Sequence, residues 1–191
     1  MRNFKVSQLV WAAALLAICI ISQFFKNLSV YITGPIINTC LIICVLTAGL
    51  GWALVLCIVT PVTSFIITGS PIMSAIPAII PCVMVGNAIL VVCEYFIAVK
   101  GAKAEESVVD NGKLSKTKLA ISLGVGTIAK AAFMGVVISL ILIPSLLPEA
   151  MLPKMNVFQM TFSFTQLITA AIGSVLAFII WVPISKAVSK N

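Results

Sequence analysis

The chain has 191 residues, of which 61% are hydrophobic and only 9% are charged, and its formal net charge is +7. A soluble domain is about half apolar and about a quarter charged, so this composition excludes a water-soluble globule, and its high hydrophobicity excludes disorder. We therefore expect one membrane domain over residues 1–191.

Apolar segments in chain order predict the spans, because a membrane-spanning helix needs about 20 apolar residues. They cover residues 6–25, 34–48, 50–68, 76–99, 118–143 and 161–184. The pattern predicts an all-α integral membrane protein, a bundle of six transmembrane helices. Arg2 and Lys5 before the first segment also fit a signal peptide, but the apolar run that follows is longer than a signal peptide needs.

Prolines predict two departures from regular helix. Pro77 and Pro81 fall in the first turns of the fourth segment, so its start is expected to be irregular. Irregular backbone at membrane depth is tolerated mainly where it lines a cavity. Between the fifth and sixth segments, residues 144–160 contain three further prolines, and we interpret this stretch as a folded-back loop.

The basic residues indicate the orientation of the bundle. Cytoplasmic loops carry an excess of Lys and Arg. If both termini are cytoplasmic, nine of the 12 basic residues fall on that side, and only Lys26 and Lys154 fall outside. The sequence therefore predicts a multi-pass protein of a cell membrane with cytoplasmic N- and C-termini. The positive charge is explained by topology, so no nucleic-acid partner is expected.

Lys130 is the remaining basic residue, and it lies inside the fifth segment. At ~1.5 Å per residue it is roughly 18 Å past Lys118, near the middle of the membrane. A cation at that depth is costly, so Lys130 either faces a cavity and binds an anionic ligand or meets a structural partner. Asn87 is predicted at the same depth and is either part of this site or a bridge between helices. Glu94 lies nearer the cytoplasm and is expected to be satisfied elsewhere.

Other polar residues also cluster in the outer half of the membrane. The sixth segment begins with alternating polar and aromatic residues, a pattern typical of a ligand pocket, although an interfacial belt would also explain the aromatic ones. We therefore predict a cavity that opens outward. Its candidate substrate-binding residues are Lys130, Asn87, Gln166, Asn38, Tyr31, Phe162 and Thr165.

Catalytic chemistry finds little support. The chain has no histidine, no P-loop and no Gly-x-Ser-x-Gly motif, so we expect no enzyme activity, no metal and no cofactor. The six cysteines lie in apolar runs. Cys40 and Cys44 share a helix face and could suggest a soft-metal site, but small buried hydrophobes explain them better.

Several of these segments resemble the substrate-binding S components of energy-coupling factor (ECF) transporters, which take up vitamins in bacteria. The resemblance covers nearly the whole chain. It is carried by Ala13-x-x-x-Ala17, by the segments 31–38, 86–90 and 128–131, and by 166–173. These read YITGPIIN, GNAIL, IAKA and QLITAAIG.

The resemblance implies a subunit that captures a vitamin-like micronutrient from outside. Its first helix would dock through Ala13 and Ala17 onto a membrane coupling subunit that carries two cytoplasmic ATPases. Lys130 favours an anionic substrate, and the absence of histidine excludes the nickel and cobalt branch of the family. The alternatives are a small integral-membrane enzyme and a membrane interaction subunit without a ligand.

Overall fold

A computed structural model describes residues 6–25, 29–100 and 116–188. In these ranges the chain is helical, and six helices are long and apolar enough to cross a membrane. This confirms the prediction of an all-α, multi-pass membrane fold. Six of the basic residues on which the predicted orientation depends lie outside the described residues: Arg2, Lys5, Lys26, Lys103, Lys113 and Lys190.

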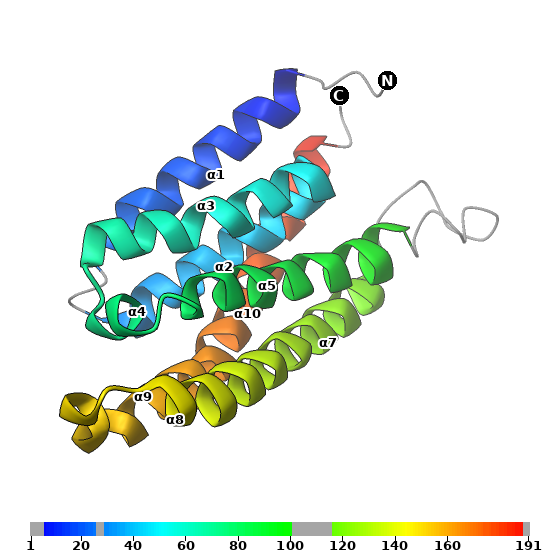
Figure 1. The fold of residues 1–191 in the computed structure, drawn as a ribbon. Coiled ribbons are helices and arrows are strands. Elements are labelled where there is room, and N and C mark those ends of the chain that lie inside the picture. Colours follow the sequence, from blue (N-terminus) through cyan, green and yellow to red (C-terminus); the bar gives the residue numbers. More distant parts are fainter. Residues whose placement is uncertain (1–5, 26–28, 101–115, 189–191) are drawn as a thin grey trace.

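The six spans are built from long helices, two of which continue as π-helices (Figure 1). They are α1 (Val6–Phe24), α2 (Val30–Thr47), α3 (Leu50–Thr68), α5 (Ile79–Glu94) with η1 (Tyr95–Lys100), α7 (Lys116–Met134) with η3 (Gly135–Leu142), and α10 (Phe164–Val188). Helix α2 is the most enclosed: 56% of its apolar window is buried, against 28–39% for the others.

Five of the spans pack side by side in a ring, and the sixth, α1, packs on its outside. Helix α2 contacts α1, α3, α5 and α10, while α7 contacts α5 and α10, and α3 contacts α5. Helix α1 packs mainly on α2 and α3, so it lies at the margin of the bundle (Figure 1). Helices α2, α3, α5, α7 and α10 thus pack as a ring, with α1 outside it.

Short helices gather at one end of the bundle. They are α4 (Pro71–Ala75), α8 (Ile143–Leu146), η4 (Glu149–Lys154) and α9 (Met155–Phe162). The start of α1 and the end of α10 lie together at the opposite end (Figure 1). This placement agrees with an even number of spans. We call the end that carries α4, α8, η4 and α9 the short-helix end.

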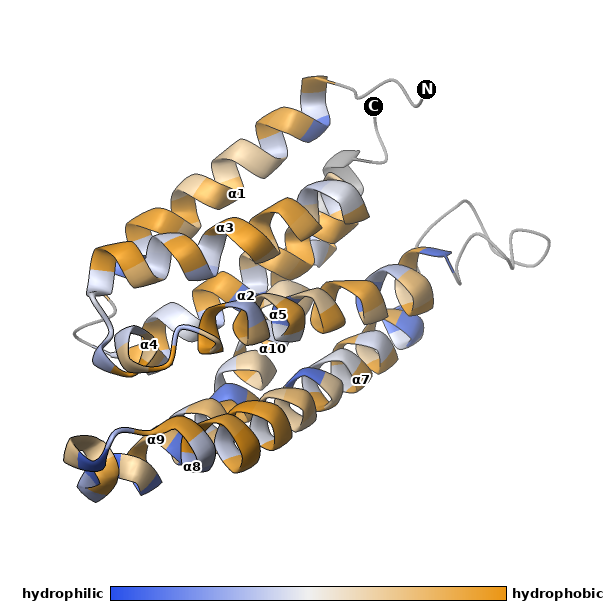
Figure 2. Cartoon of the chain, viewed as in Figure 1, coloured by the Kyte–Doolittle hydropathy of each residue, from blue (hydrophilic) through white to orange (hydrophobic). Residues whose placement is uncertain are grey.

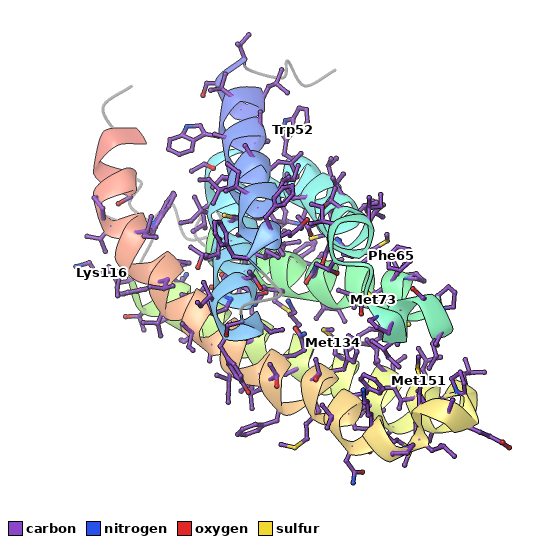
Figure 3. The ribbon with its side chains drawn as sticks, turned by 90° about the vertical axis from the view of Figure 1, so that its left-hand side faces the viewer. Trp52, Phe65, Met73, Lys116, Met134 and Met151 are labelled. Atoms are coloured by element: carbon purple, nitrogen blue, oxygen red, sulfur yellow. The ribbon has the colours of Figure 1, made fainter. Side chains whose placement is uncertain are left out.

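The outer surface of the bundle is apolar, as a lipid-facing surface must be. Figure 2 shows hydrophobic colouring along most of each long helix. Side chains such as Ile66 (73% exposed), Leu140 and Ile128 point outward. By contrast, Met134 is buried, and Figure 3 shows it between Lys116 at the start of α7 and Met151 in η4. The side chains that face lipid are thus those that a soluble protein would bury.

Two glycines bring α2 and α10 close together. A Cβ atom on Gly173 would lie 2.7 Å from Asn38 Cβ and 2.8 Å from the carbonyl oxygen of Pro35. A Cβ on Gly34 would lie 2.8 Å from the side chain of Thr169. Small residues at such crossings let two backbones approach, which favours helix association in membranes. The Thr39 hydroxyl, 3.0 Å from the Gly173 carbonyl, adds a polar contact at the same crossing.

The structure differs from the predicted boundaries near the prolines. Helix α2 begins at Val30 and runs through Pro35, four residues earlier than expected. The predicted irregular start of the fourth span is confirmed: α4 ends at Ala75, and α5 begins only at Ile79. The interpretation of residues 144–160 as a loop is wrong for most of the stretch, because α8, η4 and α9 occupy it.

Candidate ligand site

A cavity of about 280 Å³ opens among the spans at the short-helix end, where residues of α4 and α9 line it. Its walls come from the first half of α2, the second half of α3, and from α4, α5, α7, α9 and the first turn of α10. Apolar side chains such as Ile37, Met73 and Phe158 line it together with several polar groups. A mostly apolar cavity with a few convergent polar groups is typical of a small-molecule site.

Lys130 lies in the wall of this cavity and is almost completely buried, with 2% of its surface exposed. Its Nζ donates to Asn38 Oδ1 at 2.5 Å and to Asn87 Oδ1 at 2.7 Å. We refer to these three residues as the Lys130 cluster. The cluster ties together α7, α2 and α5, three helices far apart in the sequence.

The depths estimated from the sequence account for this geometry. Asn87 was predicted at the level of Lys130, and the two side chains are hydrogen-bonded. Glu94 was predicted nearer the cytoplasmic side than Lys130, and its Oε2 accepts a hydrogen bond from the Ser122 hydroxyl at 2.6 Å instead. Glu94 Oε1 is buried without a hydrogen-bond partner, so the expected satisfaction of Glu94 is met at only one of its two carboxyl oxygens.

The positive charge of Lys130 has no carboxylate partner among the described residues. The acids in those residues are Glu94, bonded to Ser122, and Glu149 in η4. Two amide oxygens solvate the ammonium group, but neither carries a formal charge. A buried charge without a counter-charge is costly unless something compensates it. The cavity beside Lys130 provides a place for an anion.

Other predicted substrate-binding residues divide into two groups. Phe162 and Gln166 line the cavity together with the Lys130 cluster. Tyr31 and Thr165 do not line it. Tyr31 is 52% exposed, and its hydroxyl lies 3.4 Å from Thr165 Oγ1, so this pair connects α2 to α10. Contact of these residues with a ligand stays a prediction.

Wall residues that the sequence did not single out come mainly from α3, α4 and α9. They include Ser64, Ser70, Met73, Val157 and Phe158. One signal pointed to α4, because the prolines of the fourth span predicted irregular backbone around a cavity. Within residues 144–160, which were interpreted as a loop, no signal singled out Val157 and Phe158 themselves.

Helix α9 is held in the cavity wall by a reciprocal pair of hydrogen bonds. Gln159 Nε2 donates to the Ser139 carbonyl at 2.9 Å, and the Ser139 hydroxyl donates to the Gln159 carbonyl at 2.9 Å. Ser139 lies in the π-helix η3, where an amide bonds to the carbonyl five residues earlier. The residue five positions after Ser139 is Pro144, which has no N–H to donate. The Gln159 side chain supplies the missing donor.

We expect Gln159→Leu to loosen α9. The substitution leaves the buried Ser139 carbonyl without a donor, which costs about 1–3 kcal/mol. Hydrogen exchange in α9 should accelerate in the variant, while exchange in α2 should stay as in the wild type. Gln166→Leu, at a glutamine whose side chain makes no hydrogen bond to η3 within the described residues, is the matched control. Equal exchange rates in α9 for both variants would contradict this role of Gln159.

The predicted docking face on α1 is exposed. Ala13 and Ala17 face away from the bundle, whereas Ala12 is buried against it. Whether a partner covers this face stays a prediction. On the buried side, Gln23 donates through Nε2 to the Thr60 carbonyl at 3.0 Å, and Thr60 lines the cavity. Helix α1 is thus joined directly to the cavity wall.

All six cysteines are free thiols, and four of them are buried: Cys19, Cys40, Cys44 and Cys57. Across the described ranges, no group of three or more His, Cys, Asp or Glu side chains is arranged to hold a metal ion. The burial agrees with cysteines that act as small hydrophobic side chains.

Comparison with known proteins yields no relative. No protein-family model, no curated protein and no solved structure matches this chain significantly. The structure itself shows an apolar bundle of six candidate membrane spans with a cavity beside a buried lysine.

Proposed function

We propose that the protein is the substrate-binding subunit of an ECF-type uptake transporter and that it binds a small anionic, vitamin-like micronutrient. The observation that carries the proposal is Lys130, a buried cation in the wall of a 280 Å³ cavity with no carboxylate partner among the described residues. Ionisable residues inside membrane proteins typically mark substrate or ion sites.

The location of the cavity supports uptake from outside. The cavity lies at the short-helix end, and the described ends of the chain lie at the opposite end (Figure 1). If the lysine distribution orients both termini toward the cytoplasm, the cavity opens outward. The resemblance to S components implies the same orientation, with the binding site reached from outside the cell. A ligand would then enter past α4 and α9, whose side chains form part of the wall.

Energy for transport would come from partners. The chain itself would perform no chemical step, and ATP would be hydrolysed by two cytoplasmic ATPases bound to a membrane coupling subunit. The exposed Ala13 and Ala17 on α1 support a docking face for that coupling subunit, because small residues let membrane helices approach closely.

The proposal is tested by isolating the tagged protein from its native membrane. We expect the purified complex to contain a membrane coupling subunit and ATPases, and Ala13→Leu with Ala17→Leu to reduce their recovery. Ile18→Leu, on an exposed position of the same helix, is the matched control. Recovery without any ATPase would favour the alternatives of a membrane enzyme or a ligand-free interaction subunit.

A further inference from the structure

The Lys130 cluster offers hydrogen-bond donors to the cavity. A lysine ammonium has three N–H donors and no acceptor, so each asparagine must turn its oxygen toward Nζ. Both do so, at 2.5 Å for Asn38 and 2.7 Å for Asn87. The amide NH₂ group of each asparagine must therefore point away from the ammonium. Lys130 thus fixes which way both carboxamides face.

The two NH₂ groups lack partners within the described protein. Neither Nδ2 atom donates a hydrogen bond within the described residues, although both side chains are buried: Asn38 is 2% exposed and Asn87 is 4% exposed. Neither Nδ2 atom is completely enclosed by protein atoms, and both asparagines line the cavity. These donors are accordingly open to the cavity. Buried polar groups need partners, so a ligand or water must accept from them.

We propose that Asn38 and Asn87, oriented by Lys130, form with it a donor-only site for a singly charged carboxylate. Two amide oxygens on one ammonium place the two carboxamides within a few ångströms of each other. A carboxylate accepts at both oxygens and needs no acceptor in return. One negative charge balances the one charge of Lys130, whereas a phosphate dianion would leave an uncompensated charge in the membrane.

This inference deepens the proposed function, because it takes the cavity as a ligand site and names the group that is recognised. Lys130 has two tasks in it: it supplies the charge, and it positions both asparagines. A neutral carboxamide in place of the carboxylate would turn an N–H toward a donor, so the site should reject it. This rejection distinguishes the proposal from one in which the asparagines only solvate Lys130.

The test uses para-fluorobenzoate and para-fluorobenzamide, a carboxylate and its neutral amide of equal size. Their binding to the purified protein in nanodiscs is measured by fluorine NMR titration, with empty nanodiscs correcting for partition into lipid. We expect the wild type to bind the carboxylate saturably and to prefer it by at least about tenfold, since hydrogen bonds to charged groups are the stronger ones. Equal affinity, or no saturable binding of the carboxylate, would overturn the proposal.

Two isosteric variants test the orientation of the amides. Asn87→Asp and Asn38→Asp keep the oxygen that accepts from Lys130 and replace the NH₂ donor with an acceptor. We expect either change to reverse the preference, so that the amide probe binds better than the carboxylate. Gln166→Glu makes the same change at a cavity residue outside the Lys130 cluster, and it should weaken carboxylate binding without any gain for the amide. The same reversal in Gln166→Glu would contradict the assignment to the cluster.

The outcome is separable from the proposed function. If the protein assembles with ATPases but binds both probes equally, the carboxylate site is wrong and the transport role stands. If the probes behave as expected but no ATPase partner is recovered, the site stands and the transport role fails. Should an aspartate variant not fold, the wild-type comparison of carboxylate and amide still decides the question.

Discussion

Lys130→Met should lose ligand affinity by a large factor while the bundle stays folded. Removing one partner of a buried, hydrogen-bonded charge pair costs about 2–5 kcal/mol of binding free energy. This corresponds to a loss of about 30-fold to about 4000-fold in affinity. Methionine fills a similar volume and removes a buried charge that has no carboxylate partner in the described residues, but it leaves the Asn38 and Asn87 oxygens without their donor. We therefore expect a folded bundle with a lower melting temperature.

The measurement is the dissociation constant of the native ligand, or of para-fluorobenzoate, together with the melting temperature. Lys154→Met is the matched control, because Lys154 is an exposed lysine in η4 that does not line the cavity. It should bind as the wild type does. Unchanged affinity in Lys130→Met would show that Lys130 has only a structural partner role.

Gly173→Ala should be the most damaging single-methyl change in the bundle. The added Cβ would lie 2.7 Å from Asn38 Cβ and 2.8 Å from the Pro35 carbonyl oxygen, and the carbonyl belongs to the rigid backbone of α2. Helix α10 must then move away from α2. Overpacking of this kind costs about 1–3 kcal/mol. Because Asn38 is itself displaced, ligand affinity should fall as well.

Gly124→Ala is the control for Gly173→Ala. A Cβ on Gly124 would meet nothing within 4 Å, and alanine favours helix by about 0.5–1 kcal/mol over glycine in a helix interior. We expect this variant to melt at or above the wild-type temperature, whereas Gly173→Ala melts below it. Equal melting temperatures for the two variants would contradict the close α2–α10 crossing.

Hydropathy was sufficient to predict the spans, because lipid selects long apolar helices whatever their contacts. It could not predict where the fifth span changes from α-helix to the π-helix η3, because that change alters the hydrogen-bond register and leaves the composition unchanged. Helix α9 was missed for a different reason, because its eight residues are too few to be predicted as a membrane span on their own.

Axial counting predicted the depth of the site residues and left their direction around each helix open. It placed Asn87 level with Lys130, and a hydrogen bond joins them. It also separated Glu94 from Lys130. It grouped Tyr31 and Thr165 with the site, although the structure places them outside the cavity wall. The depth of a residue in the membrane follows from the helical rise per residue, whereas the direction in which its side chain points depends on how the helices pack.

The most direct test of an anion-binding subunit is the small molecule that the protein carries. Wild type, Lys130→Met and Lys154→Met are purified in parallel, denatured, and their released compounds are identified by mass spectrometry. The account predicts one carboxylate-bearing metabolite from wild type and Lys154→Met, and its loss from Lys130→Met. An empty wild-type protein, or a neutral or cationic compound released equally from all three, would contradict it.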